Sequence, residues 1–553
     1  MKTKRPISFL LILVLVASLL SGCGTPGVLP PQSESVTARK TSFFADVWRG
    51  DTPYGDMEYE HYKAEWFDEY TQPLYDFART GGSQQDFSDV NFDLTDHLYY
   101  VYTLQNLIDL QYSADPTDAY AAEELAYTQE LYYTLNDEYW AALHEVAVSA
   151  HADAMKGDYA DWQIQSFADW ERAGDEELTG FNKENALVKE YYTLVAEKAP
   201  GYQDAAADVF AELVALRRPS AAANGYASYA DYCYEYDYNR DYTPADAQAL
   251  WQSAKTYFAP LIQNYAQSVY DRAVGAWSTP DIDCSPEAIL SAMGRTLPKM
   301  SSELSAAFTY MTDNGLCDIA PSDAKANTGF TLTLNYWNEP FIFNCPRGNY
   351  YDYTDMFHEF GHYANAFYTQ SDLVFGAADN DLAELQSQGM EMMFTPFFDD
   401  IFGEKYGQAV KNNALLNLVY SVVDGAMYDE FQRRCYDEEG LTGARACQIY
   451  REVYADYGYE PYDGCEYEWI SVVHNFENPF YYISYAVSAL SALELYDELQ
   501  TDWASGADRY LTVAAMDCEQ YYFSEALTQA GLADVFDPGA GEDIAAALER
   551  SFA

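Results

Sequence analysis

The sequence predicts a mainly α-helical fold with one small β-sheet, and three observations favour it. The chain has 553 residues, 49% hydrophobic and 21% charged, which is typical of a large globular protein. From about residue 43 to 225 the residue pattern is helical, with almost no strand signal. Residues 315–350 differ, because two short strand-like runs, 329–335 and 340–344, flank a turn and predict a hairpin.

The first 22 residues are expected to be a bacterial lipoprotein signal peptide. Basic residues precede an apolar run over 9–20, which is too short to span a membrane. The segment Leu20-Ser-Gly-Cys23 resembles the bacterial lipobox, after which Cys23 becomes the lipidated first residue. A plain secretory signal cut near the same place is the alternative. The sequence therefore predicts export and a lipid anchor on the outer face of the cell membrane.

Three further expectations concern the tether, the N-terminal region and the cysteines. Residues 23–42, rich in Pro and Ser, are expected to form a flexible tether, and residues 43–188 an N-terminal helical region. Eight cysteines besides Cys23 permit disulfides, and proximity suggests the pairs Cys317–Cys345 and Cys435–Cys447.

The formal net charge is −58, from 30 Lys and Arg against 88 Asp and Glu. Nucleic acid is excluded as a partner, because binding a phosphate backbone requires concentrated positive charge. The acidity indicates a well-solvated surface, although it could also attract cationic peptides. We predict no protein partner.

The pattern H-E-x-x-H occurs at His358, Glu359 and His362. Residues four apart share one face of a helix, so the two imidazoles can bind one Zn²⁺ with Glu359 beside an open position. Thr354 or Asp355 could cap the helix that carries them. A chance match is the alternative, and it is rare in a chain with 7 His.

A third protein ligand is required for such a site. Glu384 lies on a second expected helix, capped by Asp379 or Asn380, and a chain reversal would bring its carboxylate to the first helix. We therefore predict one Zn²⁺ per chain, held by His358, His362 and Glu384.

The remaining histidines of the N-terminal half lack a metal-ligand spacing, and we expect structural roles for them. His144-Glu145 begins like the zinc motif but has no second ligand. The others are His61, His97 and His151.

From about residue 190 to 540 the chain resembles M3-family oligopeptidases of the oligoendopeptidase F type. The resemblance rests on Leu216-Arg-Arg-Pro219 with Tyr242-Thr-Pro-Ala-Asp246, on the H-E-F-G-H helix, and on Glu384-x-x-Ser387-x-x-x-Glu391. It also rests on His474 followed by Pro479-Phe-Tyr-Tyr-Ile-Ser-Tyr485. It implies a catalytic region over 189–553, and a two-lobed helical zinc-metallopeptidase fold with a small sheet beside the zinc helix and a deep substrate channel.

The resemblance also implies residue roles. Glu384 would be the third zinc ligand, Glu391 a carboxylate that orients a ligand imidazole, and His474, Tyr482 and Tyr485 would reach the substrate carbonyl. Tyr482 and Tyr485 are three apart and so share a helix face. The chain departs from the family pattern at two positions. Asn365 stands where another His is usual, and Ser322 stands where Arg is common.

The function that these observations favour is a zinc-dependent metalloendopeptidase that hydrolyses short oligopeptides at the cell surface. Glu359 would act as general base on a zinc-bound water. The predicted hairpin could pair its edge with an extended substrate or could only cover the core. Two alternatives stay open: a lipid-anchored peptide-binding protein without catalysis, and a zinc dipeptidyl carboxypeptidase.

Overall fold

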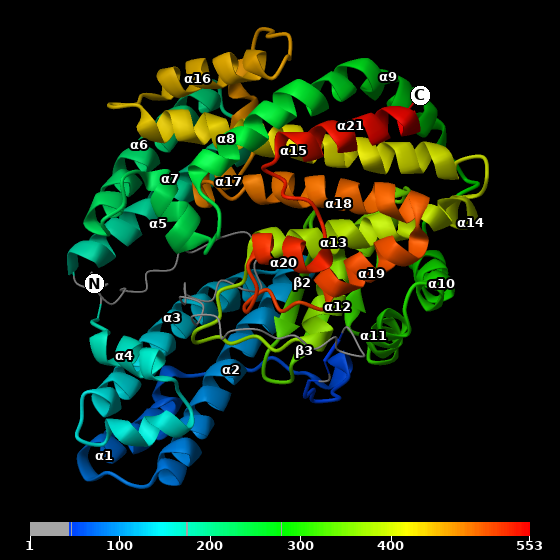
Figure 1. Ribbon diagram of the computed structural model, residues 1–553. Helices are drawn as coiled ribbons and strands as arrows, with labels where there is room; N and C mark the ends of the chain where they lie inside the picture. The colour runs from blue at the N-terminus through cyan, green and yellow to red at the C-terminus, as the bar shows by residue number, and fades with distance from the viewer. Residues whose placement is uncertain (1–43, 46, 173–174, 278, 553) are drawn as a thin grey trace.

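A computed structural model describes residues 44–45, 47–172, 175–277 and 279–552. The expected signal peptide, Cys23 and the tether lie outside the described residues. The described chain is mainly α-helical with a single small sheet, which confirms the predicted fold class. Figure 1 shows helices α1–α4 extending from one end of a larger helical body.

Eleven of the numbered α-helices precede the first strand in the chain. They are α1 (Asp68–Thr80), α2 (Gln84–Ala114), α3 (Ala119–Ala147), α4 (Asp161–Asp169), α5 (Asp175–Glu197), α6 (Tyr202–Ala223), α7 (Tyr229–Tyr232), α8 (Pro244–Ser253), α9 (Ala259–Trp277), α10 (Pro286–Thr296) and α11 (Ser302–Asp313). Helix α8 begins as expected, because Thr243 and Asp246 form a reciprocal capping box around Pro244. The expected division between residues 188 and 189 lies within α5, and it stays a prediction.

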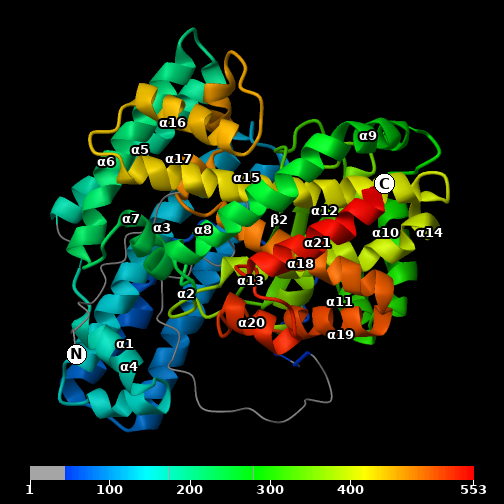
Figure 2. The same cartoon turned by 45° about the horizontal axis from the view of Figure 1, so that its top comes forward.

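The helices after the sheet build the body around the candidate site. They are α12 (Tyr351–Tyr368), α13 (Asn380–Phe394), α14 (Phe398–Phe402), α15 (Gly407–Asp437), α16 (Gly443–Asp456), α17 (His474–Glu477), α18 (Ile483–Thr501), α19 (Trp503–Ala514), α20 (Phe523–Ala530) and α21 (Pro538–Phe552). Helix α13 packs between α12 and α18, and α18 packs in turn on α15. Figures 1 and 2 show α13, α18 and α15 as successive layers, with α21 and α9 over them.

The sheet has three strands in the order β1-β3-β2, namely β1 (Cys317–Asp318), β3 (Glu339–Asn344) and β2 (Gly329–Leu334). Strands β2 and β3 form the predicted antiparallel hairpin, and Asn338 in its turn has a φ of 52°. Strand β3 is buried along its whole length, and both β2 and β3 pack against α12. The hairpin therefore supports the helix that carries the H-E-x-x-H pattern.

Helix α2 lies along the outer edge of β2. Asn106 Nδ2 donates to the Thr333 carbonyl at 2.8 Å, and the Tyr336 amide donates to Thr103 Oγ1 at 2.8 Å. The Ala326 amide also donates to the Ser113 carbonyl at 2.8 Å. The N-terminal helices are thus joined to the sheet by buried hydrogen bonds, and part of the strand edge is already occupied.

Two local expectations were wrong. Helix α12 begins at Tyr351, one turn before the expected caps Thr354 and Asp355. The reason is Asp352, whose carboxylate accepts the three amides of Arg347, Gly348 and Asn349 in the preceding turn.

The suggested disulfides are also absent, since all eight cysteines within the described chain are free. Cys317 lies opposite Ile342 in the parallel β1–β3 pair. Cys345 is therefore offset along the strand by about 10 Å, beyond the reach of about 7 Å for a disulfide. Cys435 and Cys447 are buried in α15 and α16, where each packs as a small apolar side chain.

Within the described ranges, no helix combines the length and the apolar character that crossing a membrane requires.

We predict that Asn106→Leu destabilises the fold by about 1–3 kcal/mol, because the buried Thr333 carbonyl loses its donor. The measurement is the urea unfolding midpoint followed by far-UV circular dichroism. Gln111→Leu, at an exposed position of the same helix, is the control. Equal midpoints for the two variants would contradict a role for Asn106 in joining α2 to the sheet.

Candidate active site

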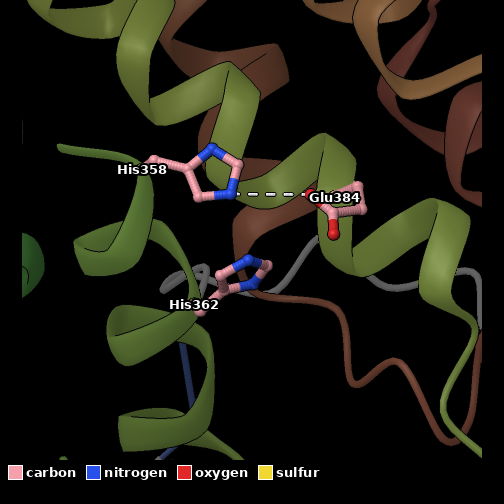
Figure 3. Close-up of side chains that lie close together, drawn as sticks. All are labelled: His358, His362 and Glu384. Carbon is pink, nitrogen blue, oxygen red and sulfur yellow. Dashed lines mark ion pairs between the residues drawn. The ribbon is translucent and has the colours of Figure 1, made fainter. Parts of the chain in front are cut away.

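Helices α12 and α13 bring together the three residues predicted as metal ligands. One potential ligand atom from each of His358, His362 and Glu384 lies within 4.8 Å of the other two. His358 Nε2 is 3.5 Å from Glu384 Oε2, and the two imidazole centroids are 5.1 Å apart. Figure 3 shows the rings and the carboxylate converging from the two helices. In the described residues, this is the one group of His, Cys, Asp and Glu side chains with such a geometry.

A glycine allows the two helices to approach closely enough. A Cβ on Gly361 would lie 2.5 Å from Ser387 Cα and 2.7 Å from the Gln386 carbonyl oxygen. Both atoms belong to the backbone of α13, so they cannot move aside as a side chain could. The Gly between the two histidines of the motif is therefore required for Glu384 to reach them.

The second nitrogen of His358 is held by a carboxylate. His358 Nδ1 lies 2.8 Å from Glu391 Oε1, as expected of the carboxylate that orients a ligand imidazole. Burial lowers the pKa of His358, but the hydrogen bond and charge of Glu391 and the charge of Glu384 outweigh it and raise the pKa to about 10. The arrangement directs Nε2 toward Glu384 and provides a strongly negative environment for a cation.

His362 supplies a free nitrogen to the same space. Its Nε2 is buried and has no hydrogen-bond partner among the described residues. Burial, together with the neighbouring His358, lowers the pKa of His362 to about 3. A neutral imidazole with an unpartnered buried nitrogen is what a metal ligand requires, so the donor set of two His and one Glu fits Zn²⁺.

Glu359 is buried beside these ligands and is fixed by the sheet. Thr331 Oγ1 on β2 donates to Glu359 Oε2 at 2.8 Å and to the Glu359 carbonyl at 3.0 Å. Burial raises the pKa of Glu359 to about 7, although the charge of His358 and the Thr331 hydrogen bond oppose the rise. A carboxyl with this pKa can exchange a proton near neutral pH.

The segment from His474 to Tyr485, which we call the 474–485 segment, lies next to α13. Its contact with a predicted ligand comes from Tyr481, whose hydroxyl donates to Glu384 Oε1 at 3.2 Å. Sequence reasoning missed Tyr481, because it looked for residues on one helical face and chose Tyr482 and Tyr485. In the structure α18 begins only at Ile483, so both Tyr481 and Tyr482 precede it.

The predicted residues of this segment cluster around Tyr481. The His474 ring stacks on Tyr481 at 4.9 Å and lies 5.8 Å from Tyr482 and 6.2 Å from Tyr485. Burial lowers the pKa of His474 to about 4, so its imidazole is neutral at pH 7. Tyr482 faces α15, where its ring meets Tyr428 edge-on at 5.0 Å. Burial raises the pKa of Tyr485 well above the usual range and so keeps its hydroxyl protonated.

A cavity adjoins the ligands. His362, Glu384, Tyr481 and Thr331 line it. Its further wall comes from Asn365 and the segment 517–519. The cavity joins β2, both ligand helices and the 474–485 segment in one space.

The two departures from the family pattern have structural roles. Asn365 Nδ2 donates to the carbonyls of Ala514 at 3.0 Å and Met516 at 2.7 Å, and so fixes the end of α19. Ser322 accepts a hydrogen bond from the Ala324 amide in an exposed turn. Neither residue contacts a predicted ligand in these interactions.

The other histidines lie away from this centre and have structural contacts, as expected. His61 contacts Glu124 at 2.8 Å, and His97 stacks on Tyr70 at 3.6 Å. His144 Nδ1 lies 2.9 Å from the Phe167 carbonyl, and the His151 ring meets Phe77 edge-on.

Residues 307–515, which include both ligand helices and the 474–485 segment, match the sequence profile of Peptidase family M3. Residues 307–515 therefore have the sequence pattern of peptidase family M3. The resemblance recognised in the sequence is thereby confirmed. No curated protein matches the chain.

Solved structures share the fold of this chain. A protein assigned as an oligoendopeptidase F superposes with a TM-score of 0.73 at 20% identity, over 91% of this chain and 98% of that one. PZ peptidase A, solved with an inhibitor, superposes with a TM-score of 0.72 at 17% sequence identity, over 90% of this chain and 98% of that one. A protein of Bacillus anthracis, also assigned as an oligoendopeptidase F, superposes with a TM-score of 0.70 at 18% sequence identity, over 91% of this chain and 98% of that one. The mainly helical architecture with one small sheet is therefore shared with these peptidase structures.

We predict that Gly361→Ala separates α12 from α13 and weakens binding of a divalent metal by at least about tenfold, because the added methyl meets backbone atoms. Affinity is measured by competition with a chromogenic chelator. The control is Gly294→Ala in α10, where the nearest atom is a Phe308 ring carbon at 3.4 Å. Unchanged metal affinity in Gly361→Ala would show that the close approach is dispensable.

Proposed function

We propose that this M3 protein is a zinc-dependent endopeptidase that hydrolyses short peptides. The observation that carries the proposal is the convergence of His358, His362 and Glu384 within 4.8 Å beside the buried carboxyl of Glu359. A binding site alone would need no buried carboxyl positioned next to the ligands. When bound there, Zn²⁺ would polarise a peptide carbonyl and make a water molecule more acidic.

Glu359 is proposed to take the proton from the attacking water and to deliver it to the leaving amine. The Thr331 hydrogen bond to Oε2 holds the carboxylate in one orientation and leaves Oε1 for the water. A pKa of about 7 lets Glu359 both accept and release this proton at neutral pH.

The 474–485 segment is proposed to stabilise the negative charge that develops on the carbonyl oxygen. Tyr485 is a protonated donor at neutral pH, because burial raises its pKa well above the usual range. Tyr482, which was also expected to take part, faces α15 and is a weaker candidate. His474 is neutral and can donate one N–H. Donors fixed in a buried site stabilise such an oxyanion more than mobile water does.

The substrate and location are further parts of the proposal. Short peptides are favoured, because the cavity beside the ligands is enclosed by two helices, a strand and the 474–485 segment. We propose an extracytoplasmic location, with a lipid anchor at Cys23, because of the expected signal and lipobox.

A carboxypeptidase is the second candidate, and one observation favours keeping it. The M32 carboxypeptidase of Deinococcus radiodurans R1 has a related fold, with a TM-score of 0.55 at 14% identity, over 88% of this chain and 100% of that one. The same scaffold therefore accommodates exopeptidases. A peptide-binding protein without catalysis is opposed by the complete ligand set and Glu359.

We predict that Glu359→Gln retains zinc but loses at least about 100-fold in kcat, because the amide cannot accept the proton. Glu384→Gln should instead lose zinc affinity, because a neutral amide is a poor ligand. Zinc content by atomic emission and hydrolysis of a quenched peptide separate the two effects. A fully active Glu359→Gln enzyme would refute the proposed base.

A pool of short, internally quenched peptides distinguishes the candidate functions. The mature protein should make internal cuts that a zinc chelator stops and added Zn²⁺ restores, with products identified by mass spectrometry. Peptides with amidated C-termini are the control, since an endopeptidase cleaves them and a carboxypeptidase requires the free carboxylate. Zinc-loaded protein that cleaves neither set would favour the binding protein.

A further inference from the structure

Arg240, in the loop before α8, is a buried cation between α13 and the 474–485 segment. Only 6% of its surface is exposed. Its Nε lies 3.2 Å from Asp381 Oδ2 at the start of α13, and its Nη1 donates to the Phe480 carbonyl at 2.9 Å. Its Nη2 donates to Ser484 Oγ at 3.0 Å. One planar guanidinium thus contacts both elements at once.

Aromatic rings fix the guanidinium in this place. The Arg240 Cζ lies 4.6 Å from the ring centroid of Tyr234, 4.5 Å from Tyr238 and 5.7 Å from Tyr242. The Tyr238 hydroxyl donates to the Pro479 carbonyl at 2.9 Å. Cation–π contacts therefore add to the polar contacts that hold Arg240 in place.

The backbone that Arg240 holds is strained. Phe480 has a φ of 65°, in the left-handed region that bulky side chains avoid. Such a conformation persists only where neighbouring groups fix it, and it is enriched at functional sites. Here Arg240 binds the Phe480 carbonyl and Gln432 Oε1 accepts the Phe480 amide hydrogen, so both sides of the residue are fixed.

The strained residue directly precedes the tyrosine that contacts a ligand. Tyr481 donates to Glu384 Oε1, and Glu384 lies on α13 about one turn after Asp381. The contacts consequently form a closed path from Arg240 to Asp381, along α13 to Glu384, across to Tyr481 and through Phe480 back to Arg240.

We propose that Arg240 is a positioning residue that sets the 474–485 segment against the ligand helix α13, so that Tyr481 meets Glu384. The inference rests on the proposed function for its catalytic consequence. Its consequence for metal affinity rests on the contacts alone, since groups that hydrogen-bond to a ligand carboxylate contribute to metal affinity.

Arg217 is a matched control. It is equally buried, with 3% of its surface exposed, and it pairs with Glu184 at 2.7 Å. It also binds the 474–485 segment, through the Phe476 carbonyl at 2.6 Å. Among the described residues, its hydrogen bonds are to α5, α15 and α17, and none is to α13. Loss of Arg217 should destabilise the fold without separating the segment from the ligand helix.

The test compares Arg240→Met, Arg240→Lys and Arg217→Met in the full mature chain. Zinc affinity is measured by chelator competition, and kcat and KM on a quenched peptide. Arg240→Met should weaken zinc binding by about 10-fold or more and lower kcat more than it raises KM. The zinc affinity and kcat of Arg240→Lys should lie between those of Arg240→Met and the unmodified protein, because one ammonium cannot bind all three partners. Arg217→Met should keep zinc affinity within about twofold.

The proposal would be overturned if Arg240→Lys and Arg240→Met bound zinc as tightly as the unmodified protein. It would also be overturned if Arg217→Met lost as much zinc affinity as Arg240→Met. If Arg240→Met does not fold, a double-mutant cycle of Arg240→Lys with Tyr481→Phe decides. We expect a combined loss of zinc affinity smaller than the product of the two single losses, since both act through Glu384. Independent losses would overturn the proposal. An inactive unmodified protein would refute the proposed function, while these affinities would still test Arg240.

Discussion

The close approach of α12 and α13 at Gly361 is the contact on which the candidate site depends. The two imidazoles come from α12 and the ligand carboxylate from α13, so their convergence requires backbone contact between the helices. The rest of the body supports this pair, because the hairpin packs on α12 and α18 packs on α13. The N-terminal helices contribute as well, since α2 is hydrogen-bonded to the strand that carries Thr331.

The electrostatics of the candidate site, like its geometry, favour a bound cation. Glu359, Glu384 and Glu391 surround two histidines. In the described part of the chain, Glu384 and Glu391 pair with His358 and not with Lys or Arg. Burial raises the pKa values of Glu359 and Glu384, so their charged forms are costly without a cation. A divalent metal would supply that charge. The overall charge of −58 adds a long-range field of the same sign.

The sequence was sufficient to predict what lies on one helix face or in one local pattern. The spacing of His358 and His362, the cap at Asp379 and the hairpin are of this kind, and the structure has each of them. Thr331, Tyr481 and Arg240 were not predicted, because each acts through contacts between segments distant in the chain. Nothing in the local pattern around Arg240 distinguishes it from the other arginines. The start of α12 was misjudged because Asp352 caps the preceding turn.

The departure at position 365 illustrates why a change within a motif can leave a metal centre intact. The amide nitrogen of Asn365 carries two hydrogens and donates them to the carbonyls of Ala514 and Met516. A neutral imidazole has a single N–H donor and could satisfy only one of these buried carbonyls. The asparagine is thus suited to the backbone that faces it, and it lies on the cavity wall outside the ligand set. Its effect should therefore fall on the shape of the cavity and not on the binding of the metal.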